Sequence, residues 1–553
     1  MATVDDVRKL ELESNGFVRS VEERAESQFY MTVEPGDVVE ACRHVLEDLD
    51  GRFVVTIGAD EREERGDFAV SHVFALDEEH VFMTVQVRLE PEDPQLESIT
   101  GIIPGASWAE RETQDLLGIT FNNLDDDRRL VLPDDWPEDL YPLRSDVPHD
   151  IDPEPVEGMA PERRDPPEDA EHATVVGLGP FYPSLEEPEY FRLFVDGETI
   201  VGCDYRGFYN HRGIEKVGAT ALTYTQVPFI AERICGICGF IHSSCYCEAL
   251  ENAINIPAPP RAKYIRSIVL ELERIHSHML WLGIAAHIVG FETAFMQSWR
   301  MREPIMWLAE KITGNRKTYG MNQVGGVRRD IPADMHPEIL DVLETLEGEW
   351  RELYEAIKGD TPLLMRLEDV GVIPVEHARE MFVVGPTCRG STLPRDVRVD
   401  QPYAAYAELP VNVITADGCD TLARTIVRIE EVFDSINMIR VALEKMPDGE
   451  LMAEIDHIPA GREGICTVEA PRGEAVHYVL TGPNNQLTRW RVRAPTYQNL
   501  QAVPEMLDGD SVADAPIGIG SLDPCFACTD RMEIVNCNTG KVELCRSEDI
   551  VDR

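Results

Sequence analysis

Two Cys-x-x-Cys pairs lie far apart in this chain, Cys235 and Cys238 in ERICGICGFIH and Cys525 and Cys528 in SLDPCFACTDR. A two-residue spacer lets both sulfurs of a pair face one metal ion while a second pair approaches from the other side. Because 290 positions separate Cys235 from Cys525, a site that unites the pairs requires the intervening chain to fold back on itself. The pairs therefore constrain the fold more than any other feature.

Paired cysteines have other uses, which must be weighed. A compact zinc ribbon needs its second pair about 15 to 20 residues after the first, so this spacing excludes one. Disulfide redox chemistry is open to either pair alone, but neither pair sits in a thioredoxin-like strand-then-helix setting. The pattern favours a single four-sulfur metal site and leaves redox chemistry as a minor alternative.

The residues around the two pairs resemble the signatures of the large subunit of NiFe hydrogenases, RxCGxC followed by His242 and DPCxxC near the end of the chain. The resemblance to the formate-hydrogenlyase type extends through residues 191–247, 261–330, 469–473 and 523–532. These membrane-associated hydrogenases share ancestry with the quinone-reducing core of respiratory complex I.

The resemblance implies a nickel–iron centre. Cys235 and Cys525 are then terminal nickel ligands, and Cys238 and Cys528 bridge nickel to an iron that carries cyanide and carbon monoxide. Soft thiolates suit both metals, and their spare lone pairs permit bridging. The implied reaction is heterolytic cleavage or formation of H2. Electrons are expected to leave through an iron–sulfur cluster in a small partner subunit, and no such cluster is expected in this chain.

Four further residues take roles by the same resemblance. Arg472, in EAPRG, is expected over the open metal position, with Pro471 lining the iron pocket. Asp523 resembles the carboxylate that orients this arginine. His242 is expected beside the bridging cysteine without being a ligand itself.

The proton acceptor is expected in the acidic loop that precedes residue 190. NiFe hydrogenases place a glutamate near the metal for this task, and a partly buried carboxyl with a raised pKa suits it. Glu187 is the candidate, with Glu186 nearly equivalent. A solvated acidic loop is an equal alternative in so acidic a protein.

The main alternative function is that of a complex I-like subunit that shapes a quinone pocket and holds no metal. The presence of all four cysteines favours a hydrogenase. In addition, Phe181-Tyr182-Pro183 stands where the related quinone reductases carry a histidine-bearing GPxHP loop. A third alternative is a purely structural scaffold in a proton-translocating complex.

Composition indicates the setting of the protein rather than its reaction. The formal net charge is −50, from 101 acidic and 51 basic residues. Such a surface disfavours nucleic acid and anionic lipid and is tolerated at high salt, so we expect a halophilic protein. The 13 cysteines are too sparse for a disulfide scaffold and fit a reducing compartment. Without a signal peptide or a membrane span, the chain is expected at the cytoplasmic face of the cell membrane, held there by partners.

The sequence predicts an α+β protein with four segments. Residues 1–148 are predicted to form a small α/β domain that resembles the 30-kDa subunit of complex I, and 149–172 an acidic proline-rich linker. Residues 173–531 are predicted to form a mostly helical large-subunit domain with β segments near both ends. Residues 532–553 are expected to be removed on maturation, by cleavage between Arg531 and Met532.

The resemblance also implies partners beyond the small subunit. These are further complex I-like soluble and membrane subunits, a maturation protease and nickel-insertion factors.

Two groups of charged or histidine residues are predicted to have no chemical role. The charged residues between 110 and 115 are expected to form a solvated or subunit-docking helix face. Apolar residues at spacings of three and four predict a long buried helix around residues 265–282. Its His276, His278 and His287 are expected to be satisfied by hydrogen bonds.

Overall fold

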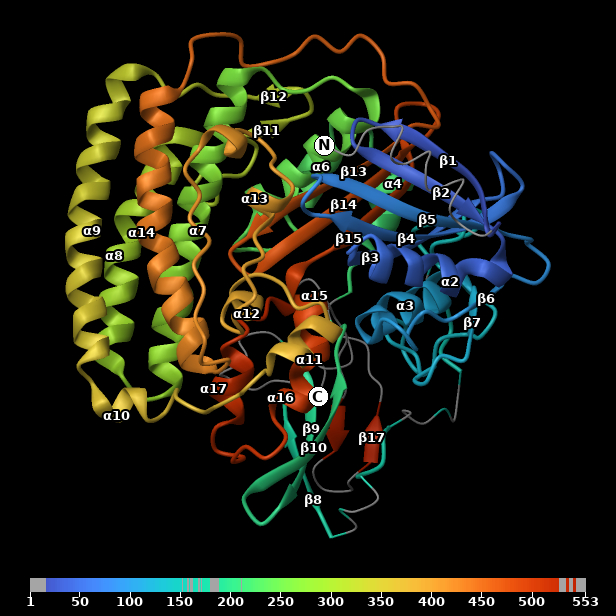
Figure 1. Ribbon diagram of the computed structural model, residues 1–553, viewed down its shortest axis with the longest axis horizontal. Helices are drawn as coiled ribbons and strands as arrows, with labels where there is room; N and C mark the ends of the chain where they lie inside the picture. Colours follow the sequence, from blue (N-terminus) through green and yellow to red (C-terminus); the bar gives the residue numbers. More distant parts are fainter. Residues whose placement is uncertain are drawn as a thin grey trace.

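The protein combines a helical bundle on one side with β-sheets on the other (Figure 1). The computed structural model describes residues 16–526, apart from gaps at 152, 157–158, 160–162, 168–169, 171, 180–187 and 210, and also residues 534–536 and 541–543. Helices and strands are both abundant, strands prevail in the N-terminal region, and a further sheet lies near the C-terminal end of the chain. The prediction of an α+β fold is confirmed.

The N-terminal module is built on a five-stranded sheet of order β1-β2-β5-β4-β3. Strands β2 and β5 are parallel, whereas the other neighbours are antiparallel. The helices α2 (Val38–Arg43) and α3 (Ser107–Leu117) lie on one side of it (Figure 1). The strands are β1 (Val18–Ala25), β2 (Gln28–Val33), β3 (Arg52–Glu61), β4 (Asp67–Leu76) and β5 (Val81–Leu89).

The other face of this sheet packs against a second sheet near the end of the chain. That sheet consists of β13 (Glu463–Ala470), β14 (Gly473–Thr481) and β15 (Leu487–Arg493), joined antiparallel in this order. Apolar side chains of β3, β4 and β5 form one buried cluster with Ile465, Val476, Tyr478 and Leu480. The N-terminal module therefore shares a core with the C-terminal part of the chain, although the two lie far apart in sequence.

The charged residues of α3 are buried, so the prediction of a solvated or subunit-docking face is wrong. Glu112 accepts two hydrogen bonds from Arg491 of β15, at 2.6 and 2.7 Å, and a third from the Tyr497 hydroxyl at 2.7 Å. Asp115 accepts from the backbone N–H groups of residues 130–132. Charge alternation in a sequence cannot distinguish water from such internal partners.

Long helices form the bundle that stands beside the sheets (Figure 1). Pro260 occupies the first turn of α7, where its missing N–H needs no partner. α7 is buried along most of its length, as predicted. The members are α7 (Pro260–Ile288), α8 (Glu292–Thr313), α9 (His336–Lys358) and α14 (Thr421–Lys445).

A third sheet opens the second module, with β9 (Tyr190–Asp196) and β10 (Thr199–Arg206) joined at Gly197, whose φ is +65°. The third strand of this sheet is β8 (Thr174–Leu178). Helix α6 (Gly239–Ile254) starts directly after the first cysteine pair. The remaining short helices include α4 (Ile214–Thr220), α5 (Val227–Ala231), α10 (Thr361–Leu364), α11 (Val375–Glu380), α12 (Pro386–Arg389), α13 (Val397–Asp400), α15 (Pro495–Asn499), α16 (Val503–Met506) and α17 (Ala515–Gly520).

The described helices include none that combines the length and the apolar character needed to cross a bilayer.

We expect Glu112→Ala to destabilise the protein by about 3 to 5 kcal/mol, because it leaves the buried Arg491 guanidinium without its bidentate partner. Chemical denaturation of the purified chain measures this change. Glu303→Ala is the control, because Glu303 pairs with Arg316 on the exposed surface, and such pairs contribute about 1 kcal/mol or less. Equal effects of the two substitutions would contradict a coupling of the modules through Glu112.

Candidate metal centre

The EAPRG stretch is the tight turn between β13 and β14. Ala470 pairs with Gly473 across the hairpin, so Pro471 and Arg472 form its tip. Gly473 has a φ of +125°, and a Cβ there would lie 2.6 Å from the backbone nitrogen of Gly385. Only glycine fits such a position without strain. The hairpin thus fixes Arg472 at the end of the sheet.

Helix α6 packs across the face of this same sheet and brings the first cysteine pair to it. A Cβ on Gly464 would lie 2.2 Å from the Ala249 carbonyl oxygen, so helix and strand are in close contact. The Cys245 thiol donates a hydrogen bond to the Cys466 carbonyl at 3.1 Å. Because α6 starts at Gly239, this packing holds the preceding cysteines near the hairpin tip.

The first cysteine pair forms a compact loop at the start of α6. The backbone N–H groups of Ile237 and Cys238 point at the Cys235 sulfur, at 3.3 and 3.4 Å. Such N–H groups and the positive end of the helix dipole both favour a thiolate. The pKa of the Cys238 thiol is raised well above its ordinary value. A hydrogen bond with Cys235 is the larger cause, and burial is the second.

The second pair approaches from the C-terminal end of the chain. The Cys525 sulfur lies 3.1 Å from the Cys235 sulfur, far beyond the length of about 2.05 Å of a disulfide bond. Two sulfurs bound to one metal at about 2.3 Å would lie roughly 3.1 to 3.8 Å apart. The Cys525 N–H is held by the Thr496 hydroxyl at 3.0 Å. The structure therefore brings two cysteines that are 290 positions apart together at sulfur.

The donors present fit a thiophilic metal. Cys235, Cys238 and Cys525 are buried, and within the part of the chain that the structure describes no disulfide joins them to one another. Thiolates in such a place need a cation to offset their charge, and soft sulfur ligands select nickel, iron and similar metals. Within the described ranges, no three histidine, cysteine or carboxylate side chains form a ready-made cage. The fourth cysteine, Cys528, lies outside the described residues, as do Glu186, Glu187 and residues 181–183.

Arg472 and Asp523 form a buried pair beside the cysteines. Arg472 Nε donates to the Asp523 carbonyl at 2.6 Å, one Nη donates to its carboxylate at 2.8 Å, and the other donates to the Ser277 hydroxyl at 3.2 Å. Burial acts to lower the pKa of the Arg472 guanidinium. The negative charges of Asp523 and of the three cysteines outweigh burial and raise this pKa above its ordinary value. Burial raises the pKa of Asp523 to about 6, against the opposing effect of Arg472.

A second arginine, Arg428 of α14, stands behind this pair. Its guanidinium carbon lies 4.2 Å from the centre of the Trp281 ring. Burial lowers the pKa of Arg428 to about 10, and Asp523 is the charge that most opposes this shift. Arg428 Nε and Asp523 Oδ2 are buried and have no hydrogen-bond partner among the residues that the structure describes. Sequence reasoning missed Arg428 and Ser277, because both lie inside long helices and belong to no motif.

His242 lies one turn after Cys238 in α6 and is 1% exposed. Burial lowers its pKa to about 4, although the nearby Cys235 opposes this shift. Pro471 is buried at the hairpin tip next to Arg472. All proposed site residues that the structure describes therefore lie near the start of α6 or near the hairpin tip.

The three histidines of α7 differ from one another. His278 Nε2 bonds Glu431 at 2.8 Å, and His287, at the exposed end, bonds Glu292 at 2.7 Å. The prediction of hydrogen-bonded histidines is wrong for His276, which is 1% exposed and has no partner at either ring nitrogen within the described residues.

Two buried glutamates that sequence reasoning passed over support the first cysteine loop. Glu273 of α7 accepts from the Phe240 and Ile241 N–H groups, at 3.1 and 2.9 Å, and so caps the start of α6. Glu232 accepts from the Gly320 N–H at 2.7 Å. Burial raises the pKa of Glu273 to about 8 and that of Glu232 to about 7. Glu232 stands three positions before the first cysteine pair in ERICGIC, and this closeness in sequence is the signal that could have indicated its role.

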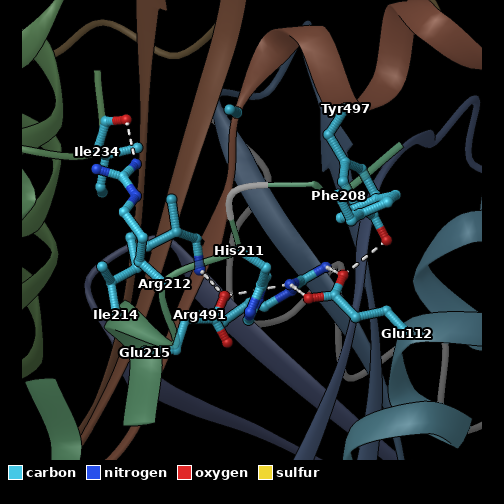
Figure 2. A pocket seen from close by; sticks show the side chains of 11 residues that line it. Glu112, Phe208, His211, Arg212, Ile214, Glu215, Ile234, Arg491 and Tyr497 are labelled. Atoms are coloured by element: carbon cyan, nitrogen blue, oxygen red, sulfur yellow. Dashed lines mark hydrogen bonds and ion pairs between the residues drawn. The ribbon is translucent and has the colours of Figure 1, made fainter. Parts of the chain in front are cut away.

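A small cavity of about 40 Å³ adjoins this loop at Ile234 (Figure 2). Arg212 donates to the Ile234 carbonyl at 2.9 Å. Glu215, at the cavity wall, accepts from Arg491 at 3.2 Å and from the Val492 N–H at 2.9 Å. Burial would raise the pKa of Glu215, but Arg489 and Arg491 outweigh it and lower the pKa. The cavity has room for about two or three water molecules. The charged group in its wall is the Glu215 carboxylate.

Comparison with known proteins places this site in a family. Residues 212–283 match the family model described as nickel-dependent hydrogenase. Residues 31–152 match the respiratory-chain NADH dehydrogenase 30 Kd subunit, and residues 289–461 and 454–531 match its 49 Kd subunit. Formate hydrogenlyase subunit 5 of Escherichia coli is 42% identical over 93% of this chain and 90% of the relative. The chain belongs to the complex I-related family of NiFe hydrogenase large subunits.

A second relative agrees with this assignment, and a solved structure shares much of the fold. Hydrogenase-4 component G of Escherichia coli is 40% identical over 94% of this chain and 91% of its own. A solved structure of the membrane-bound sulfane sulfur reductase, an archaeal respiratory membrane complex, contains a chain that superposes with a TM-score of 0.62. That chain is 28% identical to this one. The match covers all of that chain and 66% of this one. The predictions of the family, of hydrogenase function and of an oxidoreductase are confirmed.

We expect Cys235→Ser to reduce the nickel content of the purified NiFe hydrogenase subunit from about one per chain to background, because a hydroxyl is a poor ligand for a soft metal. Elemental analysis measures the change. Cys245→Ser is the matched control: Cys245 is equally buried in α6, and serine retains its hydrogen bond to the Cys466 carbonyl. Equal nickel in both variants would contradict the assignment of Cys235 as a ligand.

Proposed function

We propose that this chain cleaves or forms H2 at a nickel–iron centre held by Cys235, Cys238, Cys525 and Cys528. The observation that carries the proposal is the 3.1 Å approach of the Cys235 and Cys525 sulfurs in a buried site beside Arg472. By family resemblance, Cys235 and Cys525 would hold the nickel, and Cys238 and Cys528 would also hold the iron, which would carry cyanide and carbon monoxide. When bound, the centre supplies the Lewis acidity and the redox capacity that heterolysis of H2 requires.

The residues of the chain supply a buried positive charge. Arg472 presents a fixed positive charge at the cysteine cluster, and Asp523 and Ser277 hold its planar group from two sides. A preorganised charge in a site without water acts more strongly than one in solvent. Pro471, at the same hairpin tip, is proposed to line the iron pocket.

The proton is proposed to pass to Glu187, with Glu186 as the alternative. These residues lie a few positions before β9, and the ring of Phe191 in β9 contacts that of Phe526 at 6.5 Å. Phe526 is adjacent to Cys525. Glu187 stands four positions before Phe191 in the sequence, and four residues span at most about 14 Å, so its place in the sequence is compatible with the proposal.

Electrons are proposed to leave through an iron–sulfur small subunit that docks over the first cysteine loop. Gly236 is exposed between the two cysteines, and Phe229, 43% exposed, and Arg233 lie on the segment that leads to it. An exposed aromatic and an arginine are typical anchors of a protein interface. Further complex I-like soluble and membrane subunits, a maturation protease and nickel-insertion factors complete the proposed set of partners.

The proposed setting is the inner face of the cell membrane, in a cytoplasm of high salt. The net charge of −50 supports a high salt concentration around the protein. Repulsion between so many like charges is tolerable only when salt screens it. The proposed division of the chain is 1–148, 149–172, 173–531 and 532–553, with the last segment removed after Arg531.

We expect Arg472→Lys to lower the H2 turnover of the assembled complex about a hundredfold while nickel is retained, because an ammonium cannot hold Asp523 and Ser277 in a planar fork. Turnover and nickel are measured on the same sample. Arg266→Lys is the control, since Arg266 is also buried and bidentate, to Glu251 at 2.7 and 2.9 Å. Unchanged turnover in Arg472→Lys would refute the role of the arginine.

We expect the intact mass of the nickel-loaded chain to correspond to residues that end at Arg531. Mass spectrometry of chain from active complex, compared with chain made without nickel, tests this expectation. Full-length chain in an active, nickel-loaded sample would rule out the cleavage.

A further inference from the structure

Two buried glutamates stand opposite each other at the base of the hairpin that carries Arg472. Glu469 of β13 pairs with Glu474 of β14, next to the Ala470–Gly473 pair that closes the turn. Both glutamates are 1% exposed. Residues directly opposite on neighbouring strands have their Cβ atoms about 4.5 to 5.5 Å apart, and like charges there destabilise the pairing. The hairpin therefore needs a positive charge on each of its two strands.

The helical part of the chain supplies the first of these charges. Arg389 of α12 donates to the Glu469 carboxylate at 2.9 Å. Gly385, directly before α12, has no room for a side chain, since a Cβ there would lie 2.3 Å from the Gly473 Cα. Helix α12 thus meets both the β13 strand and the turn of the hairpin.

The N-terminal module supplies the second charge. Arg52, the first residue of β3, is 6% exposed, and its Nη1 lies 2.9 Å from Glu474 Oε2. This carboxylate oxygen has no directed hydrogen bond within the described ranges, so the contact acts mainly through charge. It joins the N-terminal module to a residue only two positions after Arg472.

Arg52 is itself held firmly before it meets the hairpin. Its Nε and its second Nη donate to the two oxygens of Asp77 at 2.8 and 3.1 Å, which is the planar two-bond arrangement of a strong ion pair. Burial acts to lower the pKa of Arg52, but Asp77 and Glu474 outweigh it and raise this pKa above its ordinary value. The guanidinium therefore remains charged and has a fixed orientation.

A neighbouring arginine joins the same two elements. Arg493 of β15 pairs with the other oxygen of Glu474 and donates twice to the Val54 carbonyl of β3, at 3.1 and 3.2 Å. Strand β3 is thus fixed to the hairpin at residue 52 and again at residue 54. Because only Gly473 separates Glu474 from Arg472, a shift of Glu474 is passed directly to the turn.

We propose that Arg52 of the N-terminal module is a positioning residue for Arg472. By pairing with Glu474 it offsets the repulsion between the two glutamates, fixes the hairpin tip and so places the Arg472 guanidinium at the cysteine cluster. The inference rests on the proposed function, in which Arg472 acts on the reacting centre. Without Arg52, a shift of the adjacent turn relieves the repulsion, and a misplacement of about 1 Å can cost about a hundredfold in rate.

The test uses the assembled complex and measures kcat, KM for H2 and nickel content on the same sample. Arg52→Met keeps most of the length of the side chain and removes its charge. We expect it to lower kcat about tenfold at unchanged KM and unchanged nickel, because a misplaced arginine weakens the reacting state and not the entry of H2.

The same substitution in chain that also carries Arg472→Lys separates positioning from general weakening of the structure. Once the guanidinium is absent, its position no longer matters, so we expect Arg52→Met to lower kcat further by no more than about twofold. A purely structural role would lower kcat by the same factor in both backgrounds.

Arg24→Met is the matched control for loss of an ion pair between the module and β13. Arg24 of β1 donates to the buried Glu463 at 2.8 Å, at the end of β13 that lies away from the hairpin. We expect unchanged kcat in this variant. The same kcat in Arg52→Met and Arg24→Met, or the same loss with and without Arg472→Lys, overturns the proposal.

If Arg52→Met does not assemble, Arg52→Lys and Arg24→Lys decide the question. An ammonium keeps the charge but cannot hold Asp77 by two bonds while it meets Glu474, so we expect Arg52→Lys to lower kcat about threefold. Arg24→Lys is expected to leave kcat unchanged, and equal values in these two variants overturn the proposal. The proposed function fails separately, through wild-type complex that holds no nickel or turns over no H2.

Discussion

The close packing of α6 on the β13–β15 sheet is the constraint on which the rest of the site depends. One face of the helix meets the sheet so tightly that Gly464 has no room for a side chain beside Ala249. The start of the helix carries the first cysteine pair, and the hairpin of the sheet carries Arg472. Helix and hairpin are thereby fixed to one another before any metal is bound, and Cys525 completes the arrangement from the end of the chain.

Around this frame, the interior is unusually rich in charge. Arg274, Arg389 and Arg398 are fully or almost fully buried, and they are compensated by carboxylates such as Glu431, which Arg389 contacts at 2.8 Å. Breaking one member of such a pair leaves an uncompensated charge in the interior. These contacts tie α7, α12 and α14 to the sheet, because Arg389 also pairs with Glu469 of β13 and Arg274 donates to the Glu469 and Ala470 carbonyls. The acidic surface and the charged interior are thus separate features of the same sequence.

Much of the fold and part of the site follow from local patterns. The helix around residues 265–282 was predictable because its apolar residues recur at spacings of three and four, and the motif cysteines and Arg472 were marked by their neighbours. Ser277, Arg428 and Glu273 were not, because they act through contacts between distant elements. The charged face of α3 was misinterpreted for the same reason: Glu112 finds its partner almost four hundred residues later. Sequence periodicity reports which residues are buried, but not what a buried charge meets.

The core shared by the two sheets has a consequence for biosynthesis. Strand β5 ends at Leu89, and β13, which covers the apolar side of that first sheet, begins only at Glu463. At about 5 to 20 residues per second, a ribosome needs roughly 20 to 75 seconds to make the chain between them. During this interval the first sheet presents a bare apolar face, so the nascent polypeptide depends on chaperones or on transient cover until about its last sixth emerges.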